Sequence, residues 1–169
     1  MKTLVLVRHA KSDWGDPALP DHDRPLNDRG RRDAPRMGAL LAERGTRPEV
    51  ILSSTATRAR KTAEAFAAAL DLGEGALVLD RRLYGSSPAT MLAVLAELDE
   101  RDERLGEAVE VAVLVAHDPG IAEFAEQLSD GRIDRMPTCA IAEFAFEVDS
   151  WSELRGARPS SVRFDRPER

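Results

Sequence analysis

The residues with the clearest chemical potential are basic and lie in three separate segments, at Arg8-His9, at Arg58 and at His117. A phosphate monoester carries nearly two negative charges at pH 7, and guanidinium groups match that charge and grip its oxygens in a fork. A neutral imidazole is nucleophilic and is available near pH 7, since the ordinary histidine pKa is about 6.5. Brought together, these groups could bind a phosphoryl group and attack its phosphorus.

Each of these residues also has an ordinary structural explanation. An Arg-His pair arises easily by chance in a chain with 24 lysines and arginines, and an arginine such as Arg58 is most often a solvated helix residue. Asp118, next to His117, suits the cap of a helix better than it suits catalysis. His22 lies among aspartates and prolines and is expected to be exposed. The three histidines lack the spacing of metal ligands, so no metal is expected.

The elements that must position these residues follow from the pattern of apolar residues. Short apolar runs predict strands at residues 4–7, 50–52, 77–79, 111–116 and 138–146, with an edge strand at 162–164. Helical periodicity and start signals predict helices at residues 28–44, 59–70, 87–98 and 118–128. This alternation indicates an α/β fold, a single-domain three-layer α/β/α sandwich with a mostly parallel sheet over residues 1–169.

Three of the expected strands end next to the chemically capable residues. The first ends at Arg8-His9, the second at Ser53-Ser54 shortly before Arg58, and the strongest at His117. Ligands of such sheets bind at the carboxyl ends of the strands. We therefore expect the three segments to face one crevice.

Composition limits the class of protein. A chain of 169 residues with 43% hydrophobic content is long enough for one domain with a real core. The net charge of -6 argues against a nucleic-acid partner. Cys139 is the single cysteine, which excludes an intramolecular disulfide, and we expect it to be buried in a strand. The apolar run at the N-terminus is too short for a membrane span or a signal peptide, so we expect no membrane partner and a cytoplasmic location.

The same segments resemble the motifs of a known family. Leu6-Val7-Arg8-His9-Ala10-Lys11-Ser12 resembles the Arg-His-Gly signature of the histidine phosphatase (phosphoglycerate mutase-like) superfamily, with alanine in place of the usual glycine. Residues 53–59 and Thr62-Ala63 resemble its second motif, and residues 115–120 its third, with His-Asp-Pro-Gly for the usual His-Asn-Pro-Gly. The small size, Arg-His-Ala-Lys-Ser and residues 25–30 are similar to SixA-type phosphohistidine phosphatases.

The resemblance implies a phosphoglycerate mutase-like fold and a metal-independent phosphatase without a cofactor. It implies that His9 is the nucleophile and that Arg8, Arg58 and His117 form the phosphate pocket, with Ser12 also binding substrate. A phosphorylated protein is the partner that this assignment suggests.

The general acid has no obvious counterpart here. Larger relatives use an acidic residue, often glutamate, between the second and third motifs, whereas residues 80–87 contain no glutamate. The remaining candidates are Asp13, Asp16, Asp21, Asp23 and Asp80. An alkoxide leaving group needs a proton, but a phosphorylated imidazole can leave neutral if its far nitrogen already carries one. The lack of a clear general acid therefore favours phosphohistidine in a protein as the substrate.

Two other functions fit the same residues. A small-molecule phosphomonoesterase or mutase could use this scaffold, although the chain lacks the long helical insertion that would cover a metabolite. A non-catalytic module that binds a phosphorylated ligand would keep the arginines and need no nucleophile. The sequence leaves open the partner protein, the oligomeric state and whether residues 11–23 close over the site.

Overall fold

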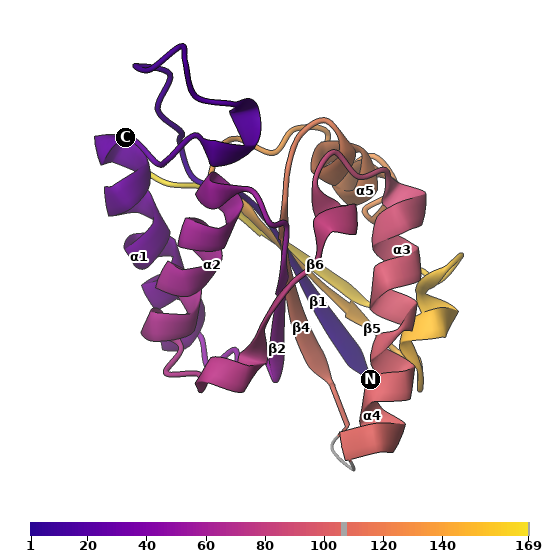
Figure 1. Cartoon of the computed structure of the whole chain (residues 1–169). Coiled ribbons are helices and arrows are strands. Elements are labelled where there is room, and N and C mark those ends of the chain that lie inside the picture. The colour runs from indigo at the N-terminus through magenta and orange to yellow at the C-terminus, as the bar shows by residue number, and fades with distance from the viewer. Residues whose placement is uncertain (106–107, 169) are drawn as a thin grey trace.

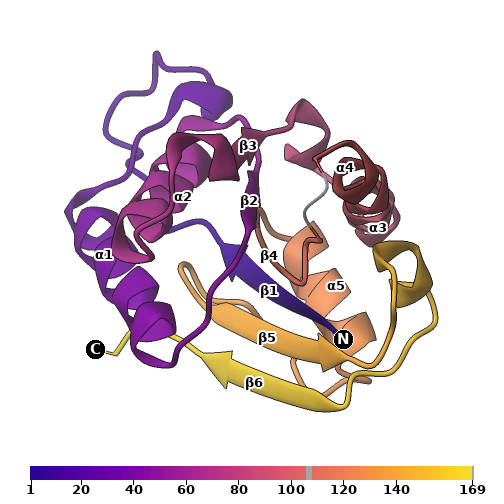
Figure 2. The same ribbon diagram turned by 90° about the horizontal axis from the view of Figure 1, so that it is seen from below.

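The computed structural model describes residues 1–105 and 108–168, without the side chains of residues 102–105. Six strands form one sheet in the order β3-β2-β4-β1-β5-β6, which Figure 2 shows from below. The strands are β1 (Lys2–Arg8), β2 (Val50–Ser53), β3 (Leu77–Leu79), β4 (Val111–Ala116), β5 (Ile141–Phe146) and β6 (Ser161–Asp165). β1, β2, β3 and β4 pair in parallel, and β5 is antiparallel to β1 and β6. The prediction of a mostly parallel sheet is confirmed.

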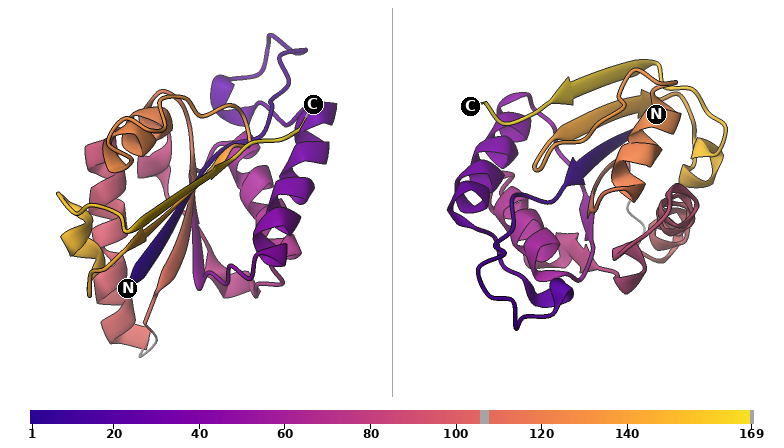
Figure 3. Two further views of the ribbon diagram at one scale, coloured as in Figure 1. Left: turned by 180° about the vertical axis from the view of Figure 1, so that it is seen from behind. Right: turned by 90° about the horizontal axis from the view of Figure 1, so that it is seen from above.

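Helices cover both faces of this sheet, as Figures 1 and 3 show. α1 (Asp28–Glu43) and α2 (Thr57–Ala69) lie on one face, and α3 (Pro88–Ala96), α4 (Leu98–Leu105) and α5 (Gly120–Leu128) lie on the other. Short 3-10 helices occur at Asp21–Asp23, Glu74–Ala76, Arg81–Leu83 and Trp151–Leu154. The three-layer α/β/α architecture predicted from the alternation of elements is confirmed.

The core is divided by the sheet because side chains alternate along each strand. Along β1, Leu4 and Leu6 pack with α3 and α5 in one buried cluster, whereas Val5 and Val7 pack with α1 and α2 in another. All four side chains are fully buried. A strand buried on both faces is apolar at successive positions, which is why this run reads as continuous rather than alternating.

Some expected boundaries differ from the observed ones. The helix expected over residues 87–98 divides into α3 and α4 at Glu97, although Ser87 caps α3 through its side chain as expected. The strand expected from residue 138 begins at Ile141, because Cys139 lies in a turn with φ of 62°. Cys139 is buried as predicted, but it is not in a strand. The helix expected from Asp118 begins at Gly120, and Pro119 occupies its cap position.

Candidate active site

The carboxyl ends of the three central strands bring the predicted residues together. His9 follows β1 and His117 follows β4, and the centroids of their rings lie 5.0 Å apart. Ser54 follows β2, and the first turn of α2 carries Arg58. All four side chains are buried. The expectation that three strand ends face one site is confirmed.

His9 is held in one tautomer by its own loop. Its Nδ1 lies 2.7 Å from the carbonyl oxygen of Ala10. A carbonyl only accepts hydrogen bonds, so Nδ1 carries the ring proton and Nε2 keeps the lone pair. Burial, more than repulsion from His117 and the two arginines, lowers the pKa of His9 to about 3. At neutral pH this side chain is an uncharged imidazole with Nε2 as its nucleophilic atom.

The main chain around His9 is fastened to α2. The amide of Ala10 donates to Oγ1 of Thr62 (2.9 Å), and the same hydroxyl donates to the carbonyl of Arg58 (2.8 Å). Thr62 is completely buried. One hydroxyl therefore links the position of His9 to the helix turn that carries Arg58.

Both arginines are anchored by their terminal nitrogens. Arg58 donates from Nη1 to the carbonyl of Asp21 (2.7 Å) and from Nη2 to its carboxylate (2.9 Å). Nη1 of Arg8 donates to the carbonyl of Met136 (3.0 Å) and lies 3.2 Å from the carboxylate of Asp118. In the part of the chain that the structure describes, Nε of each arginine is buried without a hydrogen-bond partner. The anchored ends hold each guanidinium in place.

His117 likewise has one nitrogen with a hydrogen-bond partner and one without. Its Nε2 lies 2.7 Å from the hydroxyl of Ser54, and its Nδ1 is buried with no partner among the described residues. Burial, followed by repulsion from Arg58, lowers the pKa of His117 to about 4, so the ring is neutral at pH 7. Buried polar atoms are rarely left unpaired, and three such nitrogens belong to residues whose charges or rings act on His9.

A loop that precedes α1 forms one wall of the site, at the upper end of the molecule in Figure 1. Asp21 accepts from Arg58, from Arg24 (3.1 Å) and from the hydroxyl of Tyr84 (2.5 Å). Arg24 is buried and also donates to Ser12 (2.7 Å). Sequence reasoning missed Arg24 and Tyr84, since neither belongs to a motif or follows a strand.

Two expectations concern this loop. His22 was expected to be simply exposed, but its Nε2 lies 2.9 Å from Oγ1 of Thr55 and its ring packs edge-on against Tyr84. Ser12 was expected to bind substrate, which stays a prediction; its buried hydroxyl accepts from Arg24, and its main chain forms a bridge with Leu26 that pairs the start of the loop with its end. These contacts join segments far apart in the sequence, which is why no local pattern predicts them.

The five candidate acids are placed very differently. Asp13 and Asp16 accept from amides of their own loop, and Asp23 lies beside His22 on the outside. Asp80 pairs with Arg82, which lowers its pKa. Asp21 alone among the five contacts Arg58.

The hydrogen bond from Tyr84, with the contacts of Arg58 and Arg24, holds the pKa of Asp21 well below its usual range. This carboxylate is ionised at neutral pH and is poorly suited to donate a proton. Asp118 behaves oppositely, because burial raises its pKa although Arg8 lies beside it. It was expected to cap α5; it lies one residue before the cap position, its carboxylate accepts from the amide of Ala122 in the first turn, and it also pairs with Arg8.

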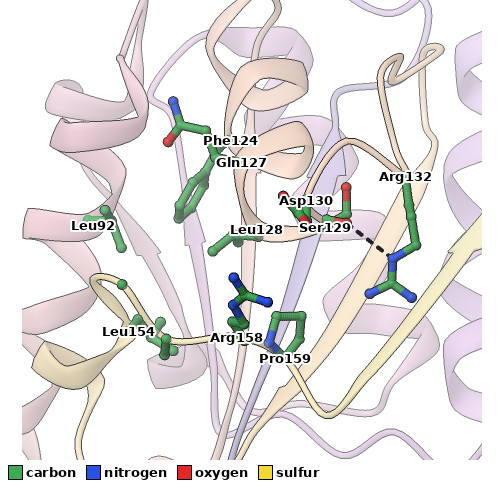
Figure 4. A pocket seen from close by; sticks show the side chains of 12 residues that line it. Leu92, Phe124, Gln127, Leu128, Ser129, Asp130, Arg132, Leu154, Arg158 and Pro159 are labelled. Atoms are coloured by element: carbon green, nitrogen blue, oxygen red, sulfur yellow. Dashed lines mark hydrogen bonds between the residues drawn. The ribbon is translucent and has the colours of Figure 1, made fainter.

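A separate pocket of about 580 Å³ lies away from these residues. Figure 4 shows it between α3, α5 and the segment that follows the last 3-10 helix, with Leu92, Phe124 and Arg158 among its lining. None of the residues that the motifs singled out lines it.

The described residues contain neither a cluster of metal-ligating side chains nor a membrane-spanning helix. No group of three or more histidine, cysteine or acidic side chains there could hold a metal ion. No helix there is long and apolar enough to cross a membrane.

Comparison with known proteins identifies the family. Residues 4–84 match the model of the histidine phosphatase superfamily (branch 1). An uncharacterised protein of Mycobacterium tuberculosis is 36% identical over 171 residues, which covers 95% of this chain and 99% of that protein.

Solved structures agree with this match. A crystal structure from Agrobacterium tumefaciens, provisionally named phosphohistidine phosphatase SixA, is 28% identical with a TM-score of 0.77 and covers 98% of this chain and 99% of its own. The protein histidine phosphatase SixA in complex with tungstate is 20% identical with a TM-score of 0.70 over 96% of this chain and 94% of its own, and shows the shared fold. The chain belongs to the histidine phosphatase superfamily, and this membership supports phosphatase activity.

Proposed function

We propose that this chain, as one domain over residues 1–169, removes phosphoryl groups from phosphohistidine in a protein through a phosphohistidine intermediate on His9. The observation that carries the proposal is a set of three buried nitrogens, on residues that act on this neutral histidine, with no partner among the described residues: Nε of Arg8, Nε of Arg58 and Nδ1 of His117. In the transition state of phosphoryl transfer, the charge spreads over three equatorial oxygens. Three fixed donors suit those three oxygens.

In the first step the lone pair on Nε2 of His9 attacks the phosphorus and the bond from phosphorus to the substrate breaks. The ring proton stays on Nδ1 and donates a hydrogen bond to the carbonyl of Ala10, which stabilises the positive charge that the ring acquires. In the second step a water oxygen attacks the phosphorus, the bond to Nε2 breaks, and inorganic phosphate leaves. His9 then regains its lone pair.

The choice of substrate rests on the leaving group. An alkoxide needs a proton as it departs, whereas an imidazole whose far nitrogen is protonated departs neutral. Asp21, the candidate acid in contact with Arg58, is held ionised by its neighbours. This arrangement favours an activated phosphoryl donor over an alkyl phosphate.

The experiment compares phosphorylated peptides of one sequence, with phosphohistidine or with phosphoserine, on the wild type, His9→Ala and His22→Gln. We expect faster release of phosphate from phosphohistidine and an acid-labile label on the wild type and on His22→Gln, with none on His9→Ala. Full turnover by His9→Ala would refute the covalent mechanism. Equal rates on both peptides would refute the substrate assignment and leave the mechanism standing.

Asp118 is the observation that favours a second candidate, a phosphomonoesterase. Its half-buried carboxyl follows His117 and has a raised pKa, so it could supply a proton to an alkoxide. Asp118→Asn distinguishes the two functions. A phosphomonoesterase loses turnover of the phosphoserine peptide selectively, whereas the proposed enzyme loses no more on phosphoserine than on phosphohistidine.

A further inference from the structure

Ser54 lies directly behind His117 and is completely buried. Its main-chain amide donates to the carbonyl of Val115 on β4 (3.0 Å), which fixes the residue beside the end of that strand. Its hydroxyl oxygen lies 2.7 Å from Nε2 of His117 and accepts from the amide of Ala56 (3.2 Å). The hydroxyl therefore lies between the amide of Ala56, which can only donate, and a ring nitrogen of His117.

The positions of the hydrogens follow from these contacts. The hydroxyl oxygen has two lone pairs, so it can accept from the amide of Ala56 and still donate its own proton to Nε2 of His117. If Nε2 carried the ring proton instead, the serine proton would have no acceptor in the described contacts, whereas Nδ1 lacks a described partner in either arrangement. Leaving a buried polar group without a hydrogen bond is costly, so the arrangement in which Ser54 donates to Nε2 of His117 is the more stable one.

We propose that Ser54 is a positioning residue that donates to Nε2 of His117 and so places the ring proton on Nδ1, where it faces a phosphoryl oxygen. This assignment rests on the proposed function. A neutral imidazole has one N–H, and only the Nδ1–H tautomer offers a donor at the unpartnered nitrogen. The opposite tautomer would present a lone pair to an anionic oxygen and repel it.

Nitrogen-15 NMR of the histidine rings tests the tautomer directly at pH 7. The wild type, Ser54→Ala and Ser53→Ala are compared, and the His117 signals are assigned by their loss in His117→Gln. Ser53 is a matched control, since it is equally buried but its hydroxyl donates to the carbonyl of Ser54 rather than to a ring. We expect Nδ1–H in the wild type and in Ser53→Ala, and a mixture of tautomers in Ser54→Ala.

Kinetics with the phosphohistidine peptide give a second readout. Loss of one donor to a developing oxyanion lowers kcat by about 100- to 1000-fold. Ser54→Ala only redistributes the tautomers, so we expect kcat to fall by about 10- to 100-fold with a smaller change in KM. Ser54→Thr, which keeps the hydroxyl, should restore the Nδ1–H signal.

Three outcomes would overturn the assignment: Nε2–H on His117 of the wild type, an unchanged tautomer in Ser54→Ala, or an equal loss of kcat in Ser53→Ala. The first needs no Ser54 variant and holds even if Ser54→Ala fails to fold. The NMR result is also independent of turnover. A wild type with Nδ1–H, a mixture of tautomers in Ser54→Ala and no phosphoenzyme would therefore refute the proposed function while confirming the placement of the proton by Ser54.

Discussion

Acidification should reveal that His9 is held neutral in the folded chain. Its pKa is lowered to about 3, and the residue is 7% exposed. In the unfolded chain a histidine titrates near its ordinary value of about 6.5. Between these two values the unfolded chain binds a proton that the folded chain does not, so stability falls as the pH is lowered. Above pH 6.5 the effect vanishes.

The magnitude follows from the distance between the pH and the unfolded-state value. At pH 5 the unfolded chain gains about 2 kcal/mol from protonating this ring, at about 1.4 kcal/mol per pH unit. The result does not depend on the folded-state value so long as that value lies well below 5. His117 adds a similar loss, because its own pKa is lowered to about 4.

The assay is denaturant unfolding at pH 7 and pH 5 at constant ionic strength. We expect His9→Gln to lose about 2 kcal/mol less than the wild type between these pH values, because glutamine does not titrate. Ser53→Ala, a buried change without a titrating group, should show the pH dependence of the wild type. If His9→Gln and the wild type lose the same free energy, burial does not keep His9 uncharged.

Three further changes test how the site is held. A Cβ on Gly120 would lie 1.9 Å from the carbonyl oxygen of Ser86, so Gly120→Ala should lower the free energy of unfolding by about 1–3 kcal/mol in denaturant titration. Thr62→Val removes the acceptor of the Ala10 amide. It should lower the free energy of unfolding by about 1–3 kcal/mol by the same measurement and should also lower turnover. Asp21→Asn should speed proteolytic cleavage within residues 11–27 but cost no more than about 1 kcal/mol, because half of this side chain is exposed. Unchanged cleavage there would contradict the anchoring role of its carboxylate.

The sequence by itself determined the architecture and the site histidines. Continuous apolar runs at residues 4–7 and 111–116 are what strands buried on both faces require, and both runs form central strands of the sheet. Because parallel strands end at one edge, the residues after them had to meet, and His9 and His117 do.

The tertiary structure alone decided what surrounds these residues. Asp21 meets Tyr84 across 63 positions of sequence, and Ser54 meets His117 across another 63. No local pattern encodes such contacts, since they depend on how a loop and two strand ends pack. The environment then sets the chemistry: burial keeps two histidines neutral, and neighbouring donors keep one aspartate ionised. The sequence predicted His9 as a site residue from its neighbours in the chain, but the protonation states of His9 and His117 follow from neighbours in space.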